Sequence, residues 1–254
     1  MAVIALSGCG RIGFASSDGG RGSDSGGDDA GDAGNLACAG VICDRFDGPA
    51  LDPRWMADTA RGSIVVDTGR AHRGTSSVHL QTQQITTSVT NPRALLLGYQ
   101  GLGDVTQVEG NITGTIYTRV WMYFASPSPP ALFDQVTNFA DQPGNGVSIG
   151  ARAGYMVVND YTEPGYAEST TDMLPLDRWT CLQMEVASGT TATTRLFVDG
   201  VELANLALAK TTPQPRPTHV YLGLEWVGTT SSQAAADAWI DDVIVDTVPH
   251  TCAD

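Results

Sequence analysis

One short segment brings together the kinds of side chain that often bind sugars. Residues 115–124 read T-I-Y-T-R-V-W-M-Y-F, in which apolar and polar or aromatic residues alternate. A period of two predicts a β-strand whose second face carries Tyr117, Arg119, Trp121 and Tyr123. Aromatic rings can stack on sugar C–H groups, and a guanidinium can bind hydroxyls or a carboxylate. This face is therefore a candidate ligand-binding surface. The alternative is that the rings pack under a loop and the arginine forms a structural ion pair.

A second segment, residues 219–226, behaves similarly. Tyr221 and Glu225 fall on the face opposite its alternating Val and Leu residues. Gly223 lies between them and would let a ligand approach the backbone closely. We therefore add Tyr221 and Glu225 to the ligand-binding candidates.

Catalysis on a glycan would need paired acid and base groups. Glu185, in the predicted strand 179–186, and Glu225 are the best carboxylates for this role, because glycoside hydrolysis uses two carboxyl groups roughly 5–10 Å apart. The alternative is two solvated glutamates on strands. A lyase could instead use Tyr117 or Tyr123 as the base and Arg119 to neutralise a substrate carboxylate.

These candidates require strands to position them, and the sequence is rich in strand patterns. Short alternating segments are separated by turn residues, and Asp199-Gly200 is a strong two-residue hairpin signal. Such spacing predicts an all-β sandwich or barrel. The clearest predicted strands are 76–82, 115–124, 146–152, 154–159, 179–186, 194–199, 219–226 and 238–246, with weaker ones at 63–67, 94–99 and 132–139.

Four segments, in order, resemble the concanavalin A-like lectin/glucanase superfamily. They are C-D-R-F-D-G-P-A-L-D-P-R-W (43–55), R-G-T-S-S-V-H-L (73–80), D-R-W-T-C-L-Q-M-E-V with R-L-F-V-D-G-V-E-L (177–203), and I-D-D-V-I-V-D (240–246). The resemblance implies a two-sheet antiparallel jelly-roll β-sandwich whose concave face often receives a glycan. The carboxylate string E-x-D-x-x-E of its hydrolases and the alginate-lyase strings R-x-E-L-R and Q-I-H are absent. Binding is therefore expected rather than standard catalysis.

The same resemblance implies a structural calcium ion. Glucanases of this superfamily often hold calcium with an acidic residue near the first strand, a backbone carbonyl and an Asp of the last strand. The matching positions here are Asp47, the Gly74 carbonyl and Asp242. Calcium takes six to eight oxygens, so water would complete the shell. The alternative is one Asp in a turn hydrogen bond and one solvated Asp.

The N-terminal residues predict export. Leu6-Ser7-Gly8-Cys9 resembles the lipobox of bacterial lipoproteins, in which the cysteine is acylated, although no Lys or Arg precedes the short apolar run. Residues 10–36 contain mainly Gly, Ser, Ala and Asp, which predicts a disordered linker. We therefore divide the chain into a signal remnant (1–9), this linker and a β-sandwich domain (37–254).

The four remaining cysteines predict two disulfides in an exported protein. The preferred pairs are Cys38–Cys43 and Cys181–Cys252, and the main rival joins Cys43 to Cys252. A metal site is less favoured, because no C-x-x-C pair occurs and no His lies at ligand spacing from a Cys.

Net charge disfavours one class of partner, and hydropathy predicts no membrane-spanning helix. The formal net charge is −14 with only 14 Lys and Arg in 254 residues, which disfavours nucleic acid. No apolar run reaches the length of a membrane-spanning helix. The sequence thus predicts a monomeric carbohydrate-binding domain, anchored to an outer membrane or cell surface through Cys9, or otherwise secreted or periplasmic. The alternatives are a polysaccharide lyase or hydrolase with an atypical site, and a structural envelope domain without a ligand.

Overall fold

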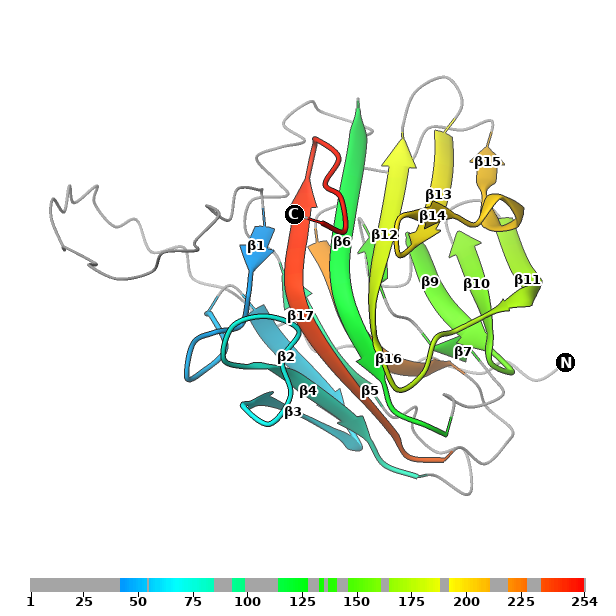
Figure 1. Ribbon diagram of the computed structural model, residues 1–254. Coiled ribbons are helices and arrows are strands. Elements are labelled where there is room, and N and C mark those ends of the chain that lie inside the picture. Colours follow the sequence, from blue (N-terminus) through cyan, green and yellow to red (C-terminus); the bar gives the residue numbers. More distant parts are fainter. Residues whose placement is uncertain are drawn as a thin grey trace, which may run out of the picture. The chain divides into compact units, whose positions relative to one another are not determined.

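Antiparallel β-strands form most of the described structure (Figure 1). Within that part, the helical content is one turn of 3-10 helix, η1 (Ala204–Leu206), and no helix is long and apolar enough to cross a membrane. The computed structural model describes residues 42–53, 55–84, 93–98, 114–127, 133–134, 137–140, 146–160, 165–187, 192–210, 219–227 and 234–253.

The first sheet, called sheet A, has β6 and β17 at its centre. Its strands run in the order β14-β13-β12-β6-β17-β4-β3, while β1 also pairs with β17 and β15 with β13. The bounds are β1 (Ile42–Asp44), β3 (Gly62–Asp67), β4 (Ser77–Thr82), β6 (Thr115–Phe124), β12 (Trp179–Ala187), β13 (Ala192–Val198), β14 (Val201–Glu202), β15 (Leu208–Lys210) and β17 (Ala236–Asp246).

The second sheet, sheet B, is also antiparallel throughout its described ladders. Its order is β11-β10-β9-β8-β16-β5-β2, with β7 pairing with β16. The bounds are β2 (Trp55–Ala60), β5 (Arg93–Gly98), β7 (Phe133–Asp134), β8 (Thr137–Ala140), β9 (Val147–Arg152), β10 (Tyr155–Asp160), β11 (Gly165–Met173) and β16 (His219–Val227).

The core lies between the two sheets and explains the alternation in the sequence. Alternate residues of β6 and β12 point inward from sheet A, and alternate residues of β9, β10 and β16 point inward from sheet B. Among the largest side chains that are fully buried there are Leu80, Ile116, Met122, Phe124, Ile149, Met156 and Leu182. The side chains on the inner faces thus pack against one another, so any ligand site must lie on an outer face or at an edge.

The predicted fold class is confirmed, and so are the predicted strands within small shifts of their ends, except that the predicted strand 132–139 is divided into β7 and β8. The hairpin at Asp199-Gly200 also forms, because both residues have positive φ angles of 51° and 80°, as a tight turn between β13 and β14 requires. Sequence analysis missed β1, β2, β11 and β15. Of these, β2 and β11 carry few apolar side chains, since they are the two edges of sheet B.

Strand β17 contains an irregularity that matters for the site. Its register with β6 shifts between Asp241 and Ile244, which marks a β-bulge. The N-terminal half of β17 pairs with β4 and the C-terminal half with β1, so the bulge lies where β17 changes its neighbour on that side. Asp242, in the bulge, has a φ of 48°.

Candidate functional site

The predicted ligand-binding residues of β6, called the β6 strip, lie on the outer face of sheet A. The apolar residues of this strand are buried in the core, so Tyr117, Arg119, Trp121 and Tyr123 point to the opposite side. Register with the neighbouring strands places Trp179 beside Tyr123, and Asp241 beside Trp121. The alternation was therefore predicted correctly. Whether these side chains can bind a ligand depends on how far they are exposed to solvent.

Residues 68–76, called the covering loop, lie over part of this strip. The ring of His72 stacks on Trp121 with 3.7 Å between ring centroids. The guanidinium of Arg70 lies 3.7 Å from the centre of the Tyr123 ring and 4.2 Å from that of Trp239, on β17. These aromatic rings are thus occupied by contacts with the protein itself.

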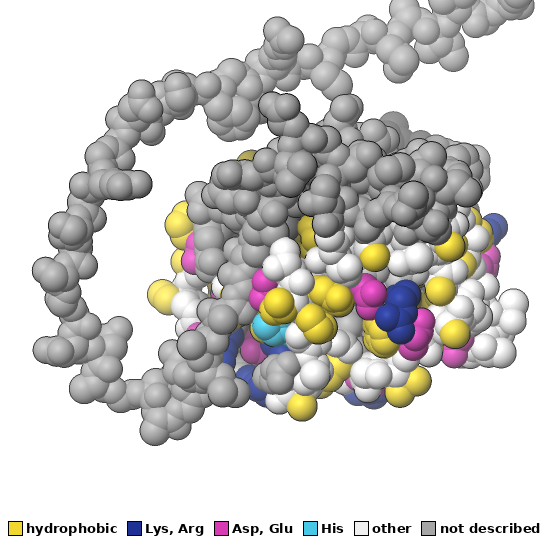
Figure 2. Space-filling view, turned by 90° about the horizontal axis from the view of Figure 1, so that it is seen from above, with side chains coloured by type: hydrophobic (Ala, Val, Ile, Leu, Met, Phe, Trp, Pro, Cys, Tyr) yellow, Lys and Arg dark blue, Asp and Glu magenta, His cyan; other side chains and the backbone are white. Residues whose placement is uncertain are grey.

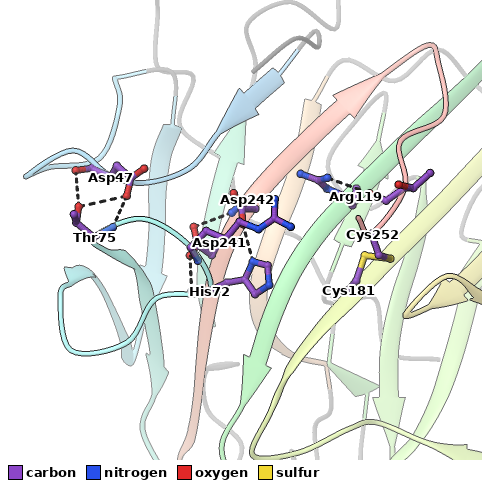
Figure 3. Close-up of polar contacts among 10 residues, drawn as sticks. Asp47, His72, Thr75, Arg119, Cys181, Asp241, Asp242 and Cys252 are labelled. Atoms are coloured by element: carbon purple, nitrogen blue, oxygen red, sulfur yellow. Dashed lines mark hydrogen bonds and ion pairs between the residues drawn. A yellow bond between two sulfur atoms is a disulfide. The ribbon is translucent and has the colours of Figure 1, made fainter. Parts of the chain in front are cut away.

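Arg119 is covered by the residues that follow β17. Its side chain is only 4% exposed, and Nη1 donates a hydrogen bond of 3.1 Å to the Thr251 carbonyl. Residues 247–253, called the C-terminal segment, double back beside β6 (Figures 1 and 3). The predicted ligand groove over Arg119 and Trp121 is therefore corrected: these side chains form a packed layer between sheet A and the segments that cover it.

Tyr117 has a different environment from the rest of the strip. With Glu185 it lines a cavity of about 280 Å³ between the outer face of sheet A and the C-terminal segment. Glu185 accepts a hydrogen bond of 3.0 Å from Arg195 Nη1, and Arg195 also pairs with Glu202. That second ion pair, more than any other interaction, keeps the pKa of Arg195 above its usual range. Tyr117 and Glu185 are thus brought together, but in a partly enclosed pocket rather than an open groove.

Tyr221 and Glu225 lie on the other side of the molecule. Val220, Leu222 and Leu224 fill the core, so Tyr221 and Glu225 face outward from sheet B. Gly223 between them is buried, and its missing side chain leaves the backbone accessible to close packing. The predicted ligand-binding residues are therefore divided between two outer faces.

This division rules out the predicted pair of catalytic carboxylates. Glu185 points outward from sheet A and Glu225 outward from sheet B. Two packed sheets are about 10 Å apart before any outward side chain is added. The two carboxyl groups cannot both lie within the separation of 10 Å or less that glycoside hydrolysis requires. A joint acid and base role for Glu185 and Glu225 is wrong.

Sheet B also carries a polar cluster that sequence analysis did not find. The hydroxyl of Tyr166 donates a hydrogen bond of 2.6 Å to Glu168, and Arg152 lies 3.4 Å from both groups. Burial, followed by the hydrogen bond to Glu168, raises the pKa of Tyr166. The cluster depends on β9, β10 and β11 being neighbours, which no local pattern reveals.

The predicted calcium ligands lie near the covering loop (Figure 3). Asp47 Oδ1 accepts a hydrogen bond of 2.6 Å from the Thr75 amide and lies so close to Gly74 that a Cβ there would be 1.9 Å away. Asp242 Oδ2 lies 2.7 Å from His72 Nδ1. In the described residues no three His, Cys, Asp or Glu side chains converge on one point. A calcium shell here would therefore need backbone carbonyls and water, as calcium sites commonly do.

Asp241 is the most perturbed carboxyl near these residues. It is fully buried, and Oδ2 accepts hydrogen bonds from the His72 and Arg73 amides. Burial and the adjacent charge of Asp242 raise the pKa of Asp241 to about 7, and the amide hydrogen bonds only partly oppose this shift. Two acidic residues thus lie side by side at a buried bulge.

The predicted bond between Cys181 and Cys252 is present, with Cα atoms 5.9 Å apart. The rival pairing of Cys43 with Cys252 is thereby excluded. Cys43 is itself disulfide-bonded, and its predicted partner Cys38 lies outside the described residues, as do Cys9 and the predicted linker. Disulfides persist in oxidising compartments, which is consistent with an extracellular or periplasmic protein.

Comparison with known proteins places this fold. No protein-family model and no curated protein matches the sequence. Among solved structures, "Cellulose induced protein, Cip1" is 16% identical with a TM-score of 0.64, over 83% of this chain and 99% of that one. The endo-beta-1,4-glucuronan lyase from the fungus Trichoderma reesei is 12% identical with a TM-score of 0.59, over 83% and 96%.

A third solved structure, the family 7 polysaccharide lyase AlgAT5, an alginate lyase, is 16% identical with a TM-score of 0.50, over 73% of this chain and 82% of that one. These identities establish likeness of fold. Together with the sheet order and the antiparallel ladders, they show that this chain has a jelly-roll β-sandwich fold similar to that of these solved structures.

Proposed function

We propose that this domain binds a polysaccharide across the outer face of sheet B. The observation that carries the proposal is a transverse row of residues in register from β5 to β11. The row consists of Leu97, Tyr221, Asn138, Ser148, Asn159 and Tyr166. Six strands at a spacing of about 4.8 Å make it roughly 24 Å long, which suits several linked sugar units rather than one.

The chemistry of the row supports a glycan ligand. Tyr166 is 47% exposed and Tyr221 is half-buried, so both rings can present a flat apolar surface to a sugar ring. Among the residues that the structure describes, the buried Ser148 hydroxyl has no hydrogen-bond partner, which is unusual for a polar group in a folded protein. Gly150 and Gly223 in neighbouring rows remove side chains that would raise the surface.

Binding without cleavage is favoured over a lyase reaction at this face. A tyrosine that abstracts a proton near neutral pH works best with a lowered pKa, whereas the pKa of Tyr166 is raised. Glu168 and Arg152 beside it are engaged with each other and with Tyr166. The names of the solved neighbours include two lyases, so product formation must be measured together with binding.

Replacing Tyr221 by alanine is expected to weaken binding of the preferred polysaccharide about tenfold, because a stacking surface worth about 1.4 kcal/mol is lost. A glycan array identifies the polymer, and affinity electrophoresis measures the change. Tyr117→Ala, on the opposite sheet, is the matched control and should bind as wild type does. If Tyr221→Ala and wild type bound the polysaccharide with equal affinity, the proposed site on sheet B would be rejected.

The same polymers, incubated with the protein, are expected to yield neither new reducing ends nor the absorbance of unsaturated sugars. Either product would show that the domain is an enzyme. Complete absence of binding across the array would instead favour the structural envelope domain.

Calcium binding remains part of the proposal. Asp47, Asp242 and carbonyls of the covering loop would hold the ion, which would fix this loop against Trp121 and neutralise the buried acidic pair. We expect added calcium to raise the melting temperature of the chelator-treated protein by several degrees, and Asp242→Asn to abolish the increase. A melting temperature that is the same in calcium and in chelator would refute the calcium site.

We further propose that Cys9 carries a lipid and that residues 10–36 form a flexible tether, which would let an anchored domain search a polymer. Metabolic labelling with clickable palmitate in the host is expected to mark the wild-type protein and not Cys9→Ser. Label that does not depend on Cys9 would contradict the anchor.

A further inference from the structure

A cavity on the outer face of sheet A is not used by the proposed polysaccharide surface. It has a volume of about 280 Å³ and lies between strands β6, β12 and β13 and the C-terminal segment. Its lining includes Tyr117, Gln183, Glu185, Phe197, Pro249 and His250. Tyr117 and Glu185 are direct cross-strand partners, so the floor of the pocket is formed by the neighbouring strands β6 and β12.

The wall formed by the C-terminal segment is fixed in place. The Cys181–Cys252 bond attaches it to β12, and Gln183 Nε2 donates a hydrogen bond of 2.6 Å to the His250 carbonyl. His250 Nε2 lies 2.9 Å from Asp246 Oδ2. A ligand would therefore meet a preformed pocket and would not have to order this segment on binding.

The side chains combine flat apolar surfaces with a few hydrogen-bonding groups. Tyr117 and Phe197 supply aromatic rings, and Glu185 offers carboxylate oxygens as acceptors. Within the part of the chain that the structure describes, no residue bonds to the Tyr117 hydroxyl. Figure 2, which views the molecule from above, likewise shows hydrophobic side chains gathered beside a histidine and near a basic group flanked by acidic ones.

Size and charge narrow the ligand class. Pockets for drug-sized molecules measure about 300–1,000 Å³, so this cavity suits a single sugar ring better than a polymer. Glu185 and Glu202 share one Arg195, and Asp246 lies beside His250, which leaves the pocket acidic. An acidic sugar would be repelled, whereas a neutral sugar needs only stacking and hydrogen bonds.

We infer that this cavity is a second carbohydrate site, which holds one free neutral sugar or glycoside independently of the polymer. The choice of a sugar as ligand rests on the proposed function, but the site is on the opposite sheet from the polymer surface and has its own residues. The protein would thus have two independent sites, one on sheet B for a polymer chain and one on sheet A for a single neutral sugar.

Titration of the full-length protein with methyl glycosides of neutral, amino and uronic sugars, followed by ¹H–¹⁵N NMR, tests this inference. We expect at least one neutral glycoside to shift the amides of His250 and Thr251, and to leave those of Ser148 and Tyr221 unchanged. Uronic glycosides should bind at least tenfold more weakly than the neutral one. Absence of shifts at His250 and Thr251 with every glycoside would overturn the second site.

Variants separate this site from the polymer surface. Tyr117→Ala is expected to weaken the neutral glycoside at least tenfold while polysaccharide binding is retained, and Tyr221→Ala should do the reverse. Tyr117→Phe, which keeps the ring, should retain most of the affinity if stacking dominates. Loss of the glycoside in Tyr221→Ala but not in Tyr117→Ala would assign it to sheet B. Unchanged polysaccharide binding in Tyr221→Ala would reject the proposed polymer surface without affecting the pocket.

Discussion

Replacing Cys181 and Cys252 together by alanine is expected to lower the free energy of unfolding by about 4 kcal/mol. The two cysteines are separated by 71 residues, and cross-linking a loop of that length removes roughly this much conformational entropy from the unfolded chain. Part of the native structure should also loosen, because the bond holds the C-terminal segment over Arg119. Urea unfolding of the oxidised wild-type protein and the double variant measures the difference.

Thr251→Ala is the matched control for this prediction. It changes the residue next to Cys252 but keeps the disulfide and the backbone carbonyl that accepts from Arg119. Its free energy of unfolding should stay within about 1 kcal/mol of wild type. A double variant that is equally stable would mean that the bond neither restricts the unfolded chain nor holds the C-terminal segment.

In calcium-free buffer the stability of the domain should decrease as pH rises from about 4 to about 7, through the contribution of Asp241. Its pKa is about 7 in the folded protein against 3.8 for an unperturbed aspartate, so in this window the folded state binds more protons than the unfolded state. The contribution is fully present below the unfolded pKa and is lost as pH passes the folded pKa. Three pKa units correspond to about 4 kcal/mol.

Other carboxyls change stability in the opposite direction, so the contribution of Asp241 must be isolated. The pKa of Asp67 is lowered, first by the hydrogen bond from Trp239, and that of Asp172 first by the Ser169 hydroxyl. Both proteins contain these other carboxyls, so their contributions cancel in the difference between the unfolding free energies of wild type and Asp241→Asn at each pH. We expect wild type to lose stability relative to this variant as pH rises. Parallel curves for the two proteins would show that Asp241 titrates normally.

Calcium provides an independent check on the same pair. A bound cation next to Asp242 would favour the charged form of Asp241 and lower its pKa. The difference between wild type and Asp241→Asn should then depend much less on pH in calcium than in chelator. An equal pH dependence in both buffers would mean that no calcium ion binds next to Asp242.

Local patterns in the sequence were enough to predict most of the strands and which of their side chains share a face. The outward set on β6 and the outward residues Tyr221 and Glu225 on β16 were assigned correctly, because a strand alternates whatever its neighbours are. Alternation does not say which sheet a strand joins. That choice depends on hydrogen bonds between distant segments, and it put Glu185 and Glu225 on opposite sides of the core.

The covering of Arg119 and Trp121 could not be predicted for a related reason. Both are sealed by irregular segments, the covering loop and the C-terminal segment, whose paths have no periodic signal. The Arg152–Tyr166–Glu168 cluster was missed because Arg152 lies on β9, whereas the other two residues lie on β11, 14 and 16 positions further along the sequence. The one long-range contact that was predicted, Cys181–Cys252, was available because cysteines can be counted and paired.

The position of β1 beside β17 has a mechanical consequence. The described chain enters the sandwich at Ile42, which pairs with Val245, and the three residues of β1 form an antiparallel ladder with the end of the last strand. A force that pulls on the chain ahead of Ile42 would load this short ladder first. Behind it, the side chain of Asp44 accepts a hydrogen bond of 2.7 Å from Trp55, and the rings of Phe46 and Trp55 are buried together in the core. Resistance to such a pull would therefore come from these two rings more than from the ladder.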